Sequence, residues 1–150
     1  MLDTLFKRYK SKRPHVYYYE RELFKHKIYP VNLLQVGMDT TLQVWLKYLQ
    51  NANIYCIDSF NNSQPANYSF LDEKRLFWSR CNPSDRKSVD KIMKEVWNKP
   101  RFDIIIDNTN NFENLKRYCI GKYYAEKKDE VICHSCCLLY TSDAADDRYR

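Results

Sequence analysis

Residues 31–58 restrict the possible folds of this chain more than any other stretch. The run from Val31 to Val36 is short and apolar and stops at Gly37, which is typical of a strand buried in a parallel sheet. The next segment predicts a helix whose apolar residues are Leu42, Val44, Trp45, Leu46 and Leu49. Residues Asn53–Asp58 then predict a second strand that ends in a carboxylate. The stretch as a whole predicts a strand, a short turn, a helix and a parallel strand.

The position of Asp58 indicates a ligand. It follows the turn at Gly37 by about 20 residues, the spacing of nucleotide-binding βαβ units, in which the acid binds ribose hydroxyls. The polar segment Ser59–Asp72 predicts a loop at the sheet edge where doubly wound sheets bind ligands. A βαβ unit without a ligand would give the same pattern, so both alternatives stay open.

Strands and helices alternate through the rest of the chain. The predicted elements are a strand at Leu76–Cys81, a helix that begins at Ser84 or Asp85 and ends at Pro100, a strand at Phe102–Asp107, a helix at Phe112–Tyr123 and a strand at Glu130–Cys133. The apolar face of the helix before Pro100 consists of Val89, Ile92, Met93, Val96 and Trp97. This alternation predicts an α/β fold with a Rossmann-like, doubly wound, mostly parallel sheet and helices on both faces.

Residues 1–30 form a predicted N-terminal helical segment that is rich in basic and aromatic side chains. Its basic residues are Lys7, Arg8, Lys10, Lys12 and Arg13, and they alternate with aromatic residues such as Phe6 and Tyr9. Such a mixture can follow a nucleic-acid backbone and stack on bases. Two helices that dock on the domain and expose their charges to solvent explain the same pattern, and we favour this interpretation.

Residues 137–150 resemble the in-frame translation of a sequencing adapter. Under this interpretation the Rossmann-like domain spans residues 31–136 and is incomplete, and residues 137–150 are an adapter-derived tail. The cluster of Cys133, His134, Cys136 and Cys137 lacks the ligand spacing that a zinc site needs. Apart from Cys137, the cysteines are predicted to be reduced core residues, namely Cys56, Cys81, Cys119, Cys133 and Cys136.

The composition points away from a membrane protein. A chain of 150 residues suits one domain with a substantial core, and its formal net charge is +6. No apolar run approaches the length of a membrane span or a signal peptide. We therefore expect a soluble, cytoplasmic protein that does not act on a membrane.

Four pieces of the chain carry a family resemblance through their order and spacing. They are Leu34–Gly37 with Leu42 and Trp45, then Asn53–Asp58, then Ser84–Asp85, then Phe102–Asp107. Together they resemble class I S-adenosylmethionine-dependent methyltransferases, and in particular the macrocin O-methyltransferase and cephalosporin hydroxylase-like group. The resemblance covers residues 17–124. It implies a methyltransferase fold with S-adenosylmethionine as the cofactor.

The resemblance also implies which residues bind that cofactor. Gly37 would open the turn under the methionine part, and Asp58 would hold the ribose hydroxyls through its two oxygens. The backbone around Asn82 would lie near the adenine. Asp39 and Asp85 lie in the matching motifs and are predicted to complete the cofactor-binding residues.

A second implication concerns the methyl-transfer site. Asp107, with Asn108 beside it, would lie at the tip of the fourth strand as the catalytic residues. Relatives use an acidic pair and a histidine there to hold a divalent metal, which lowers the pKa of a sugar hydroxyl and orients it. In this chain Asp107 is the surviving anionic ligand, because Asn108 and Asn111 replace the second acid and the histidine. Oxygen-ligated metals bind weakly to one carboxylate and neutral amides.

The first motif departs from the family pattern as well. Gln35 replaces its acid, and the turn at Met38–Thr41 is shorter and lacks the two later glycines. Asn82 replaces the acid expected beside the adenine.

Three functions are therefore compatible with the sequence. The favoured one is an S-adenosylmethionine-dependent methyltransferase that acts on a sugar or another small hydroxylated acceptor. The second is a noncatalytic methyltransferase-like binding module, and the third is a basic RNA-binding or RNA-methylating domain that uses Lys7–Arg13. A nicotinamide-dependent dehydrogenase is disfavoured, because the glycine fingerprint after the first strand is absent.

Overall fold

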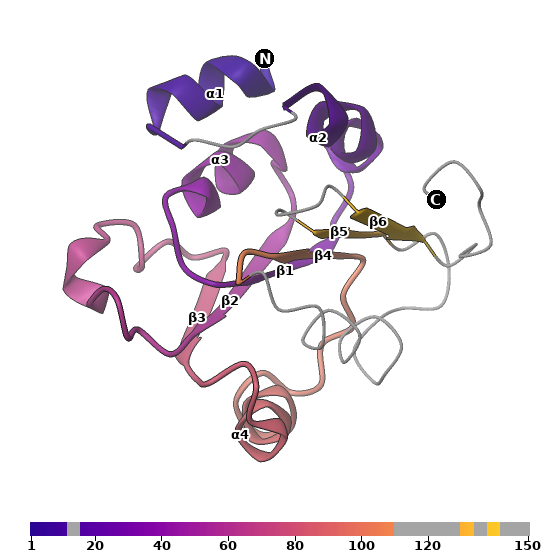
Figure 1. The fold of residues 1–150 in the computed structure, drawn as a ribbon. Coiled ribbons are helices and arrows are strands. Elements are labelled where there is room, and N and C mark those ends of the chain that lie inside the picture. The colour runs from indigo at the N-terminus through magenta and orange to yellow at the C-terminus, as the bar shows by residue number, and fades with distance from the viewer. Residues whose placement is uncertain (12–15, 110–129, 134–137, 142–150) are drawn as a thin grey trace.

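A single sheet forms the centre of the molecule. The computed structural model describes residues 1–11, 16–109, 130–133 and 138–141, and within them six strands pair in the order β3-β2-β1-β4-β5-β6 (Figure 1). The strands are β1 (Asn32–Val36), β2 (Asn53–Asp58), β3 (Leu76–Arg80), β4 (Ile104–Asp107), β5 (Glu130–Cys133) and β6 (Leu138–Thr141). All neighbouring pairs from β3 to β5 are parallel, and β6 runs antiparallel to β5.

Helices cover both faces of this sheet. They are α1 (Leu2–Arg8), α2 (Val16–Leu23), α3 (Thr41–Tyr48) and α4 (Arg86–Lys91), with short helical turns η1 (Phe24–His26), η2 (Pro65–Asn67) and η3 (Ile92–Val96). Figure 1 shows α1, α2 and α3 on one side of the sheet and α4 on the other. The predicted fold, an α/β arrangement with a mostly parallel sheet, is therefore confirmed.

The strand register brings the polar strand tips to one rim. Val36, the last residue of β1, pairs with Ile57 of β2 on one side and with Asp107 of β4 on the other. Because these strands are parallel, their carboxyl ends meet at the same edge of the sheet. This register places three residues close together at that rim, namely Gly37, Asp58 and Asn108.

Two hydrophobic clusters flank the sheet because successive side chains of a strand point to opposite faces. Leu33 and Ile104 belong to the cluster under α1, α2 and α3, whereas Leu34 and Ile105 belong to the cluster under α4. Every one of these four side chains has no solvent exposure. Burial on both faces is what an apolar parallel strand predicts.

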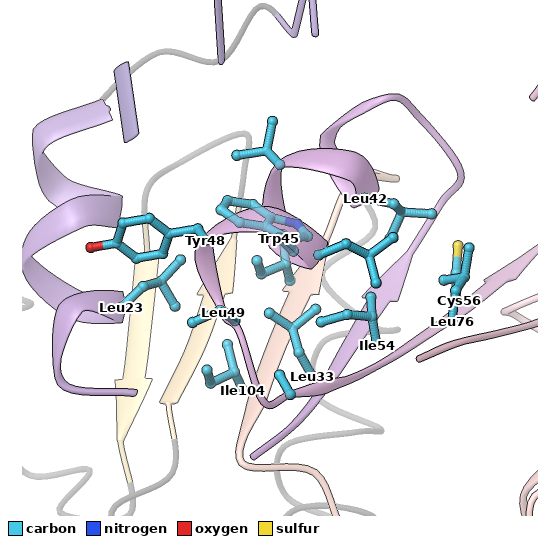
Figure 2. Packing of buried hydrophobic residues seen from close by; sticks show 14 of the residues in the cluster. Leu23, Leu33, Leu42, Trp45, Tyr48, Leu49, Ile54, Cys56, Leu76 and Ile104 are labelled. Carbon is cyan, nitrogen blue, oxygen red and sulfur yellow. The ribbon is translucent and has the colours of Figure 1, made fainter. Parts of the chain in front are cut away.

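Trp45 lies at the centre of the larger cluster. Figure 2 shows it on α3, above Leu33 and Ile54. Its ring contacts Phe6 edge-on at a centroid distance of 5.8 Å and Tyr19 at 5.8 Å. Leu2, Leu5 and Leu23 belong to the same cluster, so α1 and α2 share a core with the sheet. The predicted docking of two N-terminal helices is therefore present in the structure.

The helix before Pro100 differs from its prediction. The α-helical part ends at Lys91, and Ile92–Val96 forms a π-helical turn. A wider turn rotates the following residues around the helix axis, relative to the α-helical period of 3.6 residues. Val96, predicted to lie on the apolar face, is 59% exposed, whereas Val89 and Met93 are fully buried.

Two sequence predictions concern the C-terminal part of the chain. The predicted strand at Glu130–Cys133 is β5, and the predicted helix at Phe112–Tyr123 lies outside the described residues. Strand β6 falls within residues 137–150, the stretch assigned to an adapter-derived tail, and that assignment stays a prediction. Cys56 and Cys81 are reduced and buried.

Candidate ligand-binding site

A cleft of about 610 Å³ opens at the rim where β1, β2 and β4 end. The described residues that line it come from the turn after β1, the tip of β2, the loop after β2 and the ends of β3 and β4. They are Gly37, Met38, Asp39, Asp58, Ser59, Asn61, Asn62, Ser63, Tyr68, Pro83, Asn108 and Thr109. Its volume is in the range of small-molecule sites, and its position is where doubly wound sheets bind ligands.

Gly37 has a backbone conformation that side chains rarely adopt. Its φ is +101°, and a Cβ added there would lie 2.9 Å from the Cβ of Asn108. A glycine is required on both grounds, because the β1 turn and the end of β4 approach each other closely. The internal contact with Asn108 alone accounts for the glycine, so Gly37 does not by itself indicate a ligand.

Asp58 is held at the tip of β2 by two backbone N–H groups. Met38 N–H donates to Oδ2 at 2.6 Å, and Phe60 N–H donates to Oδ1 at 2.7 Å. The carboxylate is partly exposed and lines the cleft. An ionised carboxylate has about four acceptor positions, so these two bonds leave capacity for a ligand hydroxyl on each oxygen.

A hydrogen-bonded chain connects the core to the floor of the cleft. Trp45 Nε1–H donates to Gln35 Oε1 at 2.8 Å, and Gln35 Nε2–H donates to the Gly37 carbonyl at 2.8 Å and to Asp39 Oδ1 at 3.0 Å. Asn108 Nδ2–H donates to Asp39 Oδ2 at 2.8 Å. Gln35 has no solvent exposure, whereas Asp39 is partly exposed. Hydrogen bonds therefore connect the turn after β1 to Gln35 of β1, to Thr41 of α3 and to Asn108, which follows β4.

Asp107 has a different environment from Asp58. It is 1% exposed and does not line the cleft among the described residues. Its Oδ1 accepts hydrogen bonds from the N–H and the hydroxyl of Thr109, whereas Oδ2 is buried with no hydrogen-bond partner in the described structure. Burial raises the pKa of the Asp107 carboxyl above its ordinary value, and the Thr109 bonds act in the opposite direction.

Asn108, the other residue predicted to be catalytic, does border the cleft. Its Nδ2 bonds to Asp39, and its Oδ1 is buried with no hydrogen-bond partner in the described structure. Asn108 thus contacts the Gly37 turn rather than standing apart from it.

Asn82 and Asp85 lie outside the described lining of the cleft. The Asn82 side chain accepts a hydrogen bond from the Ser84 N–H at 3.0 Å, and the buried ring of Pro83 borders the cleft instead. Asp85 is the N-cap of α4 and accepts from the Lys87 N–H at 3.2 Å and the Ser88 hydroxyl at 2.7 Å. The Ser88 hydrogen bond lowers the pKa of the exposed Asp85 carboxyl. Both side chains stabilise local structure.

Several lining residues were not singled out from the sequence. Asn61, Asn62, Ser63 and Tyr68 come from the loop after β2, and the Tyr68 hydroxyl donates to Ser63 Oγ at 3.0 Å. The sequence predicted a polar loop at the edge of the sheet where ligands bind. That prediction did not say which residues of the loop line the cleft. The rim carries amide and hydroxyl groups suited to polar ligands.

The remaining site predictions concern a metal and the basic N-terminal segment. Among the described residues, no three His, Cys, Asp or Glu side chains are grouped so as to hold a metal ion. Lys7, Arg8 and Lys10 are exposed, and Lys7 pairs with Asp3 at 3.2 Å. Lys12 and Arg13 lie outside the described residues. Binding of nucleic acid by this segment stays a prediction.

Comparisons with known proteins identify the fold. No protein-family model and no curated protein sequence match the chain. The MycE methyltransferase from the mycinamycin biosynthetic pathway, solved with Mg and SAH, matches with a TM-score of 0.70 at 19% identity, over 89% of this chain and 34% of MycE. A second MycE structure, with Mg, SAH and mycinamycin VI, matches with a TM-score of 0.69 at 19% identity over the same shares.

A chain of the fibrillarin/Nop5p complex is a more distant match. Its TM-score is 0.50 at 16% identity, over 69% of this chain and 48% of that one. The protein therefore has the methyltransferase fold of MycE, and it spans about a third of the length of that relative. In the described part of the chain, none of the helices combines the length and the apolar character of a membrane span.

Proposed function

We propose that the protein is an S-adenosylmethionine-dependent methyltransferase whose cofactor binds in the cleft beside Gly37. The observation that carries the proposal is the Asp58 carboxylate, fixed at the tip of β2 and open to that cleft. Acids in this position of a βαβ unit bind ribose hydroxyls. The likeness in fold to MycE, which was solved with SAH, supports the same ligand class.

The described residues fit an adenosyl ligand. The cleft is of suitable size, and Asp58 retains acceptor capacity for two vicinal hydroxyls. Amide and hydroxyl groups of the loop after β2 line the other wall. When bound, S-adenosylmethionine supplies an activated methyl group on a positively charged sulfur. The protein's own contribution is to bind and orient the two reactants, which brings most of the rate enhancement in such a displacement.

The described residues do not fit a divalent metal centred on Asp107. A metal ligand has to be ionised and reachable, whereas Asp107 is 1% exposed and burial raises its pKa. We therefore assign no step to a metal here. The catalytic roles of Asp107 and Asn108 stay predictions, and Asn108 is the member of this pair that borders the cleft.

The acceptor that we propose is a sugar or another small hydroxylated molecule. The support is the resemblance to O-methyltransferases of natural-product pathways and the likeness to MycE, which was solved with mycinamycin VI. The polar rim formed by Asn61, Asn62 and Ser63 suits such an acceptor.

A noncatalytic binding module is the second candidate, and the burial of Asp107 favours it. Such a module retains the sheet and can retain the cofactor cleft, but it lacks an accessible acid at the tip of β4. Cofactor binding without transfer to any hydroxylated acceptor would indicate this second function.

Titration calorimetry with S-adenosylmethionine and with S-adenosylhomocysteine tests the proposal. We expect saturable binding of both ligands to the whole chain, and binding at least tenfold weaker for Asp58→Asn, which removes one charge and keeps the shape of the side chain. Asp72→Asn is the matched control, because Asp72 is exposed and does not line the cleft. Absence of heat at millimolar ligand, from protein with a cooperative unfolding transition, would overturn the proposal.

A further inference from the structure

The Gln35 side chain lies between the hydrophobic core and the cleft. It is fully buried in β1, and its amide makes three hydrogen bonds, one accepted from Trp45 and two donated, to the Gly37 carbonyl and to Asp39. Each bond goes to a group with a different role: a core ring, the turn backbone and a carboxylate at the cleft. A side chain with this many bonds has one possible orientation.

The identity of residue 35 is coupled to the charge of residue 39. Both groups that receive the Gln35 Nε2–H bonds are acceptors, a carbonyl and a carboxylate oxygen. A glutamate at position 35 would have no proton to donate and would place a second negative charge about 3 Å from Asp39 Oδ1. The glutamine and the aspartate are therefore complementary as donor and acceptor.

The charged residues that line the described cleft are all acidic, which favours some ligands over others. Among the described residues that line it, Asp39 and Asp58 are acidic, and none is Lys, Arg or His. Phosphate groups would be repelled by this lining, whereas a positively charged ligand group would be attracted. Asp58 lies at the tip of β2, while Asp39 lies in the turn after β1, bonded to Thr41 N–H at 2.9 Å.

We propose that Gln35 is a positioning residue that fixes the Asp39 carboxylate at the floor of the cleft, where Asp39 selects ligands that carry a positive charge beside the Gly37 turn. This inference rests on the proposed function, because the positive charge belongs to the methionine part of the cofactor. It assigns the turn after β1 a role of its own, in which the carboxylate at position 39 meets the positive charge of the ligand.

The test compares two adenosyl ligands that share the ribose and the adenine. S-adenosylmethionine carries a sulfonium and an ammonium group, and 5′-methylthioadenosine carries neither. We expect Asp39→Asn to weaken binding of the charged ligand about tenfold, the value of one charge-assisted hydrogen bond, and to leave the neutral ligand within about twofold. The amide introduced at position 39 can be accommodated, because a rotated Asn108 amide would offer it the Oδ1 that now has no hydrogen-bond partner in the described structure.

A second test of the role of Gln35 exchanges its amide with the carboxylate at position 39. Gln35→Glu alone is expected to lower the unfolding midpoint strongly, because two carboxylates then face each other. The double variant with Gln35→Glu and Asp39→Asn is expected to regain part of that stability, since the new carboxylate at position 35 can accept a hydrogen bond from the new amide at position 39. It should still lack the preference for the charged ligand, because its carboxylate is buried at position 35. Gln50→Glu, at an exposed position, is the control for the substitution itself.

The outcomes separate this inference from the proposed function. If the wild type binds both ligands and Asp39→Asn keeps the same ratio of dissociation constants, the selective role of Asp39 is overturned and the cofactor site stands. If the double variant loses as much free energy of unfolding as the two single variants lose together, the pairing of Gln35 with Asp39 is overturned. Binding of neither ligand to the wild type would overturn the proposed function and the ligand-selecting role together.

Discussion

Asp58 and Asp107 end two parallel strands on either side of β1, yet their surroundings differ sharply. Both oxygens of Asp58 accept backbone N–H groups, and the carboxylate opens onto the cleft. Asp107 is 1% exposed and has one oxygen without a hydrogen-bond partner in the described structure. Equivalent positions in the sheet thus give a cleft-lining carboxylate on one side of Gly37 and a buried acid on the other. Position at a strand tip is not sufficient to bring a carboxylate to the cleft.

Removal of the Asp58 carboxylate gives the largest expected effect. In Asp58→Ala both ribose hydroxyls lose a charged acceptor, each bond being worth about 1.5–3 kcal/mol, so the affinity for S-adenosylhomocysteine should fall at least about 100-fold. The N–H groups of Met38 and Phe60 also lose their acceptor, so the thermal midpoint should fall. Calorimetry and a melting curve measure the two effects. An affinity within threefold of the wild type would show that the ligand does not use this tip of the sheet.

Gly37→Ala tests the close approach that separates the two acids. The backbone at φ +101° costs about 1–3 kcal/mol for a residue with a Cβ, and that Cβ would lie 2.9 Å from Asn108 Cβ. We expect a drop of at least that size in the free energy of unfolding, measured with urea.

Asn108→Gly removes the opposing Cβ and also the hydrogen bond of Asn108 to Asp39, so it serves as the reference background. Gly37→Ala should cost less stability in that background than in the wild type, because the backbone strain stays and the steric part is gone. If Gly37→Ala is as stable as the wild type, the turn does not have the described conformation.

The difference between the two acids also predicts a pH dependence. Because the folded-state pKa of Asp107 is raised, the native protein keeps this proton where the unfolded chain has lost it, and stability from this group falls as pH rises above the ordinary value of 3.8. Asp107→Asn cannot ionise, so its stability relative to the wild type should increase from pH 4 towards neutrality. Urea unfolding at a series of pH values measures this difference.

Cofactor affinity should stay within about twofold in Asp107→Asn, because the side chain does not line the described cleft. A variant whose relative stability is flat across this pH range would mean that Asp107 is ionised when folded.

Asp85→Ala should give the smallest effect. Loss of the N-cap bonds to Lys87 and Ser88 lowers the melting temperature slightly, because the start of α4 loses an acceptor. Cofactor affinity should not change, since the side chain lies outside the described lining of the cleft. A tenfold loss of cofactor affinity would show that Asp85 belongs to the binding site, although it lies outside the described lining of the cleft.

The fold could be predicted from the sequence because the spacing of apolar residues distinguishes strands from helices. The three isoleucines of β4 and the alternation of strands with helices predicted a sheet buried on both faces. The limit appears at Val96, where a π-helical turn interrupts the period that the prediction assumed. No residue type in that segment predicts a wider turn.

For the site, sequence could predict which residues reach the rim but not which of them face the cleft. Gly37, Asp39, Asp58 and Asn108 line it, whereas Asp107, one residue before Asn108, is buried away from it. That difference depends on the strand register and on the hydrogen bonds of Thr109, which are set by tertiary structure. The bond between Gln35 and Trp45 was also unpredictable, because it depends on how α3 packs against β1.

A crystal structure of the protein grown with S-adenosylhomocysteine tests the central claim most directly. The account predicts electron density for the ligand beside Gly37, with its ribose hydroxyls within hydrogen-bonding distance of the two Asp58 oxygens. Density for the ligand at another place on the molecule, or a cleft filled by the chain's own side chains, would contradict it.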